Sequence, residues 1–152
     1  MDACCCPPPS QAALAPCPEC GRRGERVRLR TVQSLLTVDA MTRIGRGPYQ
    51  YCPNSSCGVV YFDAAGSMFA HREVRVAIGD KDGAATATVC YCFGETLERM
   101  REEFRATGRV EAVSRVRAHM ASRRCACDLR NPRGTCCLGD LIAAAAAVVA
   151  LP

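Results

Sequence analysis

The sequence predicts a small α+β protein made of two modules, a β-rich module with one helix and then a helical module. Two observations support this expectation. Apart from three near the start, the 13 cysteines gather in groups that bracket residues 17–57 and residues 90–137. Apolar residues alternate in short segments in the first half of the chain and recur at helical spacing in the second half. With 152 residues, four Phe, four Tyr and no Trp, each half has too small a core to be stable alone, and bonds to metal ions would supply the difference.

The first module is expected to contain strands that lie beside the cysteine pairs. Alternation of apolar and charged side chains predicts a strand over Arg26–Arg30, and Thr31 has the character of a cap for a helix that ends near Met41. Two further strands are predicted at Tyr49–Tyr51 and Val59–Phe62, on either side of the second cysteine pair. A strand, a helix and a hairpin in this order indicate a zinc-ribbon-like module with one inserted helix.

A turn-rich segment separates the two halves. Glu73–Ile78 alternates in the way typical of a strand, and Gly79–Ala85 then reads as a hinge because glycine and polar residues dominate it. We place the boundary there, so that residues 17–82 form the first module and residues 83–152 the second.

The second module is expected to be helical. Thr96 has the character of a helix cap, and Gly108 is expected to end the helix that follows. Arg109–Arg123 predicts a second helix, and the short linker makes the two helices antiparallel neighbours. The apolar, alanine-rich segment Leu138–Leu151 predicts a final packing helix. It is shorter than the roughly 20 residues that a bilayer-spanning helix needs, so no membrane insertion is expected.

Four cysteines of the first module have the spacing of a zinc site. They form a C-x2-C pair and, 31 residues later, a C-x4-C pair. Zinc prefers tetrahedral thiolate cages whose paired ligands lie on tight turns, and four sulfur ligands leave no open position, so the ion would be structural. The alternatives are free thiols, or a site in which an oxygen of Asp39 or Asp63 replaces one sulfur. The expected ligands are Cys17, Cys20, Cys52 and Cys57.

The later cysteines indicate a different centre. Cys90 and Cys92 are separated by one residue, a spacing that strains a zinc chelate and suits an iron of a [2Fe–2S] cluster. They precede the Thr96 cap, where the positive end of a helix dipole would offset the negative charge of the cluster. Two more ligands must come from four later cysteines, of which the last two are adjacent, so that only one of those two easily reaches a given iron. The candidates are Cys125, Cys127, Cys136 and Cys137.

These motifs carry a resemblance to known families. The run Cys90-Tyr91-Cys92-Phe93, two helices and then Cys-x-Cys-x3-Asn-Pro-x-Gly-x-Cys-Cys resembles the cluster-binding helix-turn-helix of bacterioferritin-associated ferredoxin-like domains. With the upstream pairs and the run Cys57–Phe62, residues 17–141 resemble the N-terminal domain of CopZ-type copper chaperones. The resemblance implies one zinc ion and one [2Fe–2S] cluster, with Cys127 as the third cluster ligand and Cys137 as the fourth. Cys125 remains an alternative to Cys127.

The resemblance also implies a function. It suggests a copper metallochaperone-like role in metal homeostasis, with one-electron reduction of Cu(II) to Cu(I), Cu(I) as cargo, and a copper-transporting ATPase or a redox protein as partner. The Met-x-Cys-x-x-Cys loop of the family's second domain does not occur in this sequence. One alternative is a ferredoxin-like electron carrier or iron-handling partner without a copper role. Another is a structural or regulatory zinc protein. No enzyme is expected, because neither centre leaves an open metal position.

Residues 1–16 are expected to form a mobile arm, since they contain Pro, Ser and Ala without a period. They show no secretory signal, so we expect a cytoplasmic protein whose thiols bind metal rather than form disulfides. Cys4–Cys6 on this arm are either soft-metal ligands or dispensable. The net charge is +5, and residues 105–133 contain eight Arg. No nucleic-acid-binding motif accompanies this excess, and no nucleic-acid partner is expected.

Overall fold

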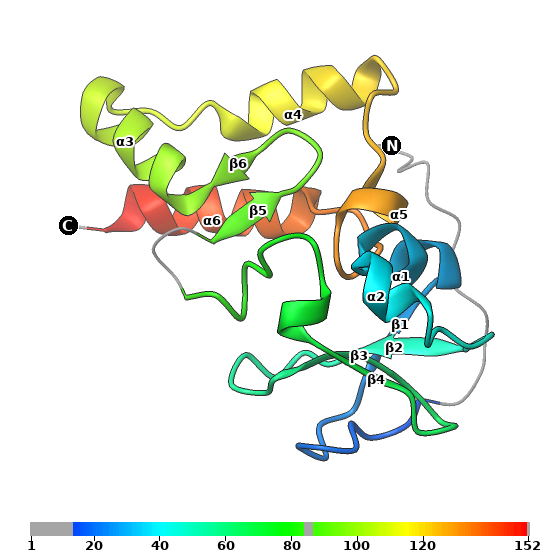
Figure 1. Cartoon of the computed structure of the whole chain (residues 1–152). Coiled ribbons are helices and arrows are strands. Elements are labelled where there is room, and N and C mark those ends of the chain that lie inside the picture. Colours follow the sequence, from blue (N-terminus) through cyan, green and yellow to red (C-terminus); the bar gives the residue numbers. More distant parts are fainter. Residues whose placement is uncertain (1–13, 84–86, 152) are drawn as a thin grey trace.

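The computed structural model describes residues 14–83 and 87–151. Most of the arm predicted over residues 1–16, including Cys4–Cys6, lies outside the described residues. The chain forms a small antiparallel sheet with short helices below a layer of longer helices (Figure 1). The sheet order is β1-β2-β3-β4, and each strand pairs with the next. This agrees with the predicted α+β class. The strands are β1 (Glu25–Val27), β2 (Tyr49–Tyr51), β3 (Val59–Asp63) and β4 (Met68–Ala70).

The helix expected from Thr31 to Met41 is two short helices, α1 (Leu29–Leu35) and α2 (Val38–Met41). The predicted strand over Arg26–Arg30 is correspondingly shorter, because α1 begins inside it. Leu36 breaks the helical run because it is extended and forms a β-bridge with Val74. The cap of α2 is Thr37, whose hydroxyl accepts a hydrogen bond from the Ala40 amide, whereas Thr31 is buried within α1.

The strand predicted over Glu73–Ile78 is wrong. The 3-10 helix η1 (His71–Glu73) occupies its start, and the rest is irregular. Val74 and Ile78 alternate because they are buried in the first core, and not because they belong to a ladder of hydrogen bonds. The sequence reading also missed β4, which returns from β3 through a turn closed by Asp63. The Asp63 carboxylate accepts hydrogen bonds from the amides of Ala65 and Ser67.

The second module begins with a hairpin of β5 (Thr88–Cys90) and β6 (Glu95–Thr96). As predicted, the Thr96 hydroxyl caps the next helix by accepting from the Arg99 amide, and Gly108 ends that helix with a positive φ. The two helices after the hairpin both pack against the last helix (Figure 1). They also contact each other, because Arg115 of the second helix pairs with Glu103 of the first; their antiparallel arrangement stays a prediction. The helices are α3 (Leu97–Thr107), α4 (Ala112–Ala121), α5 (Cys127–Arg130) and α6 (Leu138–Ala150).

Each module has its own core, and a polar interface joins them. Helix α1 packs against α5, where the Thr31 hydroxyl donates to the Asp128 carbonyl over 2.6 Å. The Tyr61 hydroxyl reaches from the sheet to the Pro132 carbonyl over 2.8 Å. These contacts fix the position of the second module's cysteine loop relative to the sheet. The boundary at residue 82 stays a prediction.

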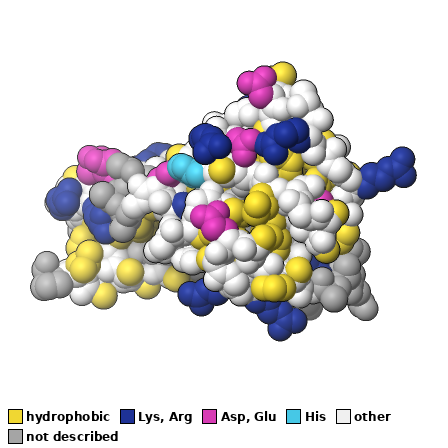
Figure 2. Space-filling model, turned by 60° about the horizontal axis from the view of Figure 1, so that its bottom comes forward, with side chains coloured by type: hydrophobic (Ala, Val, Ile, Leu, Met, Phe, Trp, Pro, Cys, Tyr) yellow, Lys and Arg dark blue, Asp and Glu magenta, His cyan; other side chains and the backbone are white. Residues whose placement is uncertain are grey.

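The surface of the sheet module carries no continuous charged patch on the face in Figure 2. Basic and acidic side chains are interspersed there, and apolar side chains gather near the centre. None of the described helices combines the length and the apolar character that crossing a membrane requires.

Candidate metal centres

The four cysteines of the first module converge on one point. All four sulfur atoms lie within 4.8 Å of one another. The Sγ atoms of Cys17 and Cys57 are 3.9 Å apart, and those of Cys20 and Cys52 are 3.6 Å apart. Tetrahedral zinc with Zn–S bonds of about 2.3 Å separates its sulfur ligands by roughly 3.8 Å. The arrangement therefore has the dimensions of a zinc–thiolate site.

Tight turns position the two pairs of sulfurs. The first turn closes when the Gly21 amide donates to the Cys17 carbonyl over 2.8 Å, and Gly21 adopts a φ of +70° that favours glycine. In the second turn the Asn54 side chain accepts from the Ser56 amide, while its carbonyl accepts from the Cys57 amide.

The environment distinguishes the four thiols. A backbone hydrogen bond from Arg22, followed by one from the Asn54 side chain, lowers the pKa of Cys20 to about 6. Burial raises the pKa of Cys52 to about 12 and also raises the pKa of Cys57. The most exposed member of the group is thus the readiest to become a thiolate, and the thiolate is the form that binds metal.

Neither carboxylate considered as a substitute ligand belongs to this group of atoms. The Asp63 carboxylate is engaged by two backbone amides in the β3–β4 turn. Asp39 lies on the exposed side of α2. The donor set brought together in the described part of the chain is four sulfurs.

The later cysteines meet around the ends of three elements. Cys90 ends β5, Cys92 lies in the hairpin turn, Cys127 begins α5, and Cys137 immediately precedes α6. Cys90, Cys127 and Cys137 are buried, whereas Cys92 is half-buried. All four pack in the core of the second module, and Cys125 packs against the same core. None of the ten cysteines in the described ranges forms a disulfide.

Among these four cysteines one pair of sulfurs is in direct contact, and Cys137 influences the acidity of two others. The Sγ atoms of Cys92 and Cys127 are 3.7 Å apart. Hydrogen bonds, first from Cys137 and then from Cys92, hold the pKa of Cys127 at about 3. The Cys137 thiol likewise lowers the pKa of Cys90 to about 7. Cys136 also contributes a hydrogen bond to Cys127.

Helix starts supply positive potential at these sulfurs. Cys137 lies at the N-terminus of α6, a helix of 13 residues, where unpaired amides and the helix dipole favour negative charge. The sequence reading assigned this role to the helix after Thr96. The sequence also indicates the more direct electrostatic contribution of α6, since Cys137 immediately precedes the predicted helix Leu138–Leu151.

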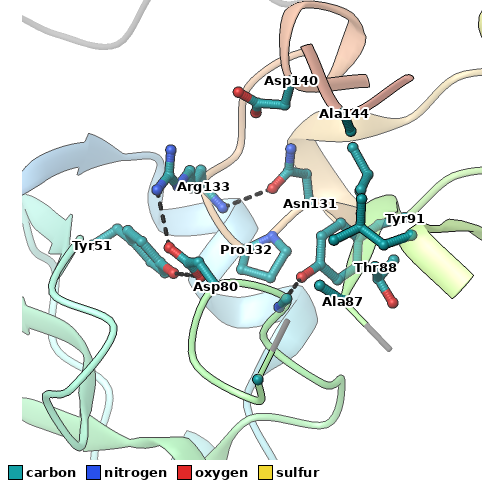
Figure 3. Close-up of a pocket in the computed structure, with 14 residues that line it drawn as sticks. Tyr51, Asp80, Ala87, Thr88, Tyr91, Asn131, Pro132, Arg133, Asp140 and Ala144 are labelled. Carbon is teal, nitrogen blue, oxygen red and sulfur yellow. Dashed lines mark hydrogen bonds and ion pairs between the residues drawn. The ribbon is translucent and has the colours of Figure 1, made fainter. Parts of the chain in front are cut away.

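The turn at Asp80 and Lys81 links the loops of both centres. The Asp80 carboxylate accepts from the Tyr51 hydroxyl over 2.5 Å and pairs with the Arg133 guanidinium at 3.0 Å (Figure 3). Lys81 Nζ donates to the carbonyls of Asn54 and Cys57 over 2.6 and 3.2 Å. Lys81 thus holds the loop of the first centre, and the neighbouring Asp80 holds the loop between Cys127 and Cys137.

A cavity of about 400 Å³ lies beside this turn, between the modules. Figure 3 shows Tyr91, Asn131 and Pro132 on its walls, close to Asp80 and Arg133. Tyr91 lies between two predicted cluster ligands, and its hydroxyl accepts from the Gly79 amide over 2.7 Å. Sequence reasoning gave no signal for this junction, because its residues are far apart in the chain.

Comparisons with known proteins agree with the assignment of the first centre as a zinc site. Residues 14–75 match a family model described as a zinc binding domain. The chain is 31% identical over 121 residues to the copper chaperone CopZ of Archaeoglobus fulgidus, which aligns with 80% of this chain and 57% of that protein. The X-ray structure of the A. fulgidus CopZ N-terminal domain matches with a TM-score of 0.68 and 29% identity, over 84% of this chain and 95% of that chain. The chain thus spans little more than half the length of the curated relative. The predicted resemblance of the zinc-binding part to CopZ is confirmed.

Proposed function

We propose that this chain is a copper metallochaperone-like protein of metal homeostasis that holds one zinc ion and one [2Fe–2S] cluster. The observation that carries the proposal is the gathering of Cys90, Cys92, Cys127 and Cys137 in the core of the second module, behind a zinc-binding module similar to that of CopZ. Its role is to bind metal and carry electrons, and we expect no catalytic turnover of an organic substrate.

The zinc site has a structural role in this proposal. Cys17, Cys52 and Cys57 are core residues of a small cluster completed by Val59 and Phe62. A core of this size contributes little on its own, and zinc binding adds folding free energy directly. The expected result is that the sheet retains its order only while the four thiolates are held together.

The second donor set fits an iron–sulfur cluster. Four cysteine thiolates are the usual ligands, and a [2Fe–2S] cluster bound there would accept and release one electron. The chain's own contribution is to bury three of the sulfurs and to stabilise charge on the fourth, because the Ala126 amide donates to Cys92 Sγ over 3.2 Å. Cys90, Cys92, Cys127 and Cys137 are the proposed ligands, with Cys125 and Cys136 as nearby thiols.

The copper role rests on similarity to the A. fulgidus protein, whose name states that it is a copper chaperone. One electron converts Cu(II) to Cu(I), the form that soft thiolates prefer. We propose Cu(I) as cargo, a copper-transporting ATPase or a redox protein as partner, and a cytoplasmic location.

Anaerobic purification tests the metal content first. We expect one zinc, two irons and two inorganic sulfides per chain, with a brown colour that bleaches on reduction. The reduced protein is then mixed with Cu(II) and a chromogenic chelator specific for Cu(I). Formation of one Cu(I) per cluster oxidised supports the copper role. A colourless sample overturns the cluster, whereas an intact cluster that yields no Cu(I) overturns the copper role alone.

A further inference from the structure

The proposed cluster has one side closer to solvent than the others. Of its four proposed ligands, Cys92 is half-buried while the other three are buried. The end of α4 and the connection after it lie against the turn that holds Cys92. There the Ala126 amide donates to the sulfur, and the Phe93 ring stacks on the His119 ring with centroids 4.4 Å apart.

This part of the surface is basic. The segment Ala112–Cys127 contains four Arg and no acidic residue. Three of these Arg are exposed, and in residues 14–83 and 87–151 no acidic side chain is paired with any of them. They are Arg117, Arg123 and Arg124.

Some arginines of the chain are neutralised by acidic neighbours. Arg115 is paired with Glu95 and Glu103, Arg133 with Asp80, and Arg30 with Asp128. Arg123 and Arg124 are distinguished by their place, because they closely precede Ala126, whose amide contacts Cys92. With no acidic partner among the described residues, they leave a positive potential there.

Arg123 also has an unusual backbone. It ends α4 with a φ of +54°, whereas every other positive φ among the described residues belongs to glycine. The Arg123 and Arg124 amides donate back to the carbonyls of Met120 and His119, a helix ending at which glycine is the ordinary residue. Helix termination alone does not account for arginine here, because glycine would end the helix with less strain. Strain of this kind points to a role for the side chain.

We propose that Arg117, Arg123 and Arg124 form a docking surface for the acidic face of a one-electron redox protein, which exchanges its electron with the cluster past Cys92. This inference rests on the proposed cluster. In one exchange the partner loses one electron and the oxidised cluster gains it, with no proton or bond transferred. Opposite charges on the two surfaces would raise the association rate at low salt and orient the partner's redox group toward Cys92.

Flavodoxin, an acidic protein that delivers single electrons as its hydroquinone, is a suitable probe. We compare the wild type with Arg123→Glu/Arg124→Glu and with a control of equal charge change, Arg105→Glu/Arg109→Glu. Arg105 and Arg109 are exposed at the α3–α4 turn, at the other end of α4 from α5 (Figure 1). Binding by titration calorimetry and cluster reduction by stopped-flow absorbance are measured at ionic strengths from ~0.02 to ~0.5 M.

We expect the wild type to bind flavodoxin and accept its electron in a salt-dependent way. Arg123→Glu/Arg124→Glu should weaken both processes roughly tenfold at low salt, and the control should change them by less than about twofold. Equal effects of the two variants, or a wild type insensitive to salt, would overturn the docking surface. Tight binding of a mixed-sequence DNA duplex, without any binding of flavodoxin, would overturn it in favour of a nucleic-acid surface.

The two readouts separate this inference from the proposed function. Binding does not require the cluster, so a colourless protein that binds flavodoxin through Arg123 and Arg124 would disprove the cluster and retain the surface. A brown protein whose variants all bind flavodoxin equally would retain the cluster and disprove the surface.

Discussion

Replacing Arg115 by alanine should destabilise the helical module more than any other single change on its surface. Glu95 is 2% exposed, and its two carboxylate oxygens accept from Arg115 over 2.9 and 3.1 Å. Removing the partner of a buried charge costs about 3–5 kcal/mol, because the charge remains buried without compensation. Two features reduce that cost here. Arg115 is itself 31% exposed, and Arg99 lies 3.7 Å from the same carboxylate. We therefore expect Arg115→Ala to lower the free energy of unfolding by about 2 kcal/mol.

Urea unfolding followed by far-UV circular dichroism, with metals bound, measures this loss. Arg117→Ala is the matched control, since Arg117 lies on the same helix but is exposed and has no acidic partner among the described residues; its effect should stay within about 0.5 kcal/mol. The double variant Glu95→Gln/Arg115→Met should recover most of the stability, because it removes both charges together. If Arg115→Ala and Arg117→Ala unfold at the same urea concentration, the ion pair between Arg115 and Glu95 does not stabilise the folded protein.

Three further changes test other parts of the structure. Cys137→Ser should lower iron content at least tenfold, whereas Cys136→Ser should leave the visible spectrum of the cluster in place; equal losses would contradict the ligand choice. Gly79→Ala should destabilise the protein by about 1–3 kcal/mol in thermal melts, since the new Cβ would lie 2.3 Å from a backbone oxygen. The control Gly139→Ala has open space around its Cβ and should be neutral or stabilising. A hydrogen bond from Arg115 lowers the pKa of Glu103. The stability that ionised Glu103 contributes is therefore present above the ordinary carboxyl pKa, and it is lost as the pH falls through the lowered value. Glu103→Gln should reduce the loss of stability measured by urea unfolding between about pH 5 and pH 3, and an unchanged acid slope would contradict this assignment.

Sequence patterns predicted elements well where a local signal decides the outcome. Strand β2, the Thr96 cap and the glycine end at Gly108 all depend on residues within a few positions of one another. The same reasoning failed where a distant partner decides. Leu36 is extended because Val74 pairs with it, and no propensity of the helix from Leu29 onward indicates that break.

The candidate sites follow the same division. Cysteine spacing singled out the four sulfurs that the structure brings within 4.8 Å, because pairs on tight turns depend on local geometry. Spacing could not choose among the later cysteines. Cys136 and Cys137 differ in the structure because α6 begins after Cys137, which is buried at the helix start while Cys136 remains partly exposed. The choice between two adjacent cysteines thus depends on where a helix begins, and sequence patterns define such positions only to within a few residues.

The turn at Asp80 and Lys81 was beyond sequence reasoning for a related reason. Two oppositely charged neighbours in a polar turn are ordinarily solvated, and their partners are 24 to 53 residues away in the chain. In the folded protein Lys81 holds two carbonyls of the zinc-site loop, while Asp80 holds Arg133 beside the loop of the second centre. Each loop alone could adopt other conformations, because short glycine- and proline-containing loops have little core to restrain them. Since one turn restrains both, ordering of either loop by metal favours the conformation that the other needs. The two centres are therefore expected to stabilise each other through this turn, although no ligand is shared between them.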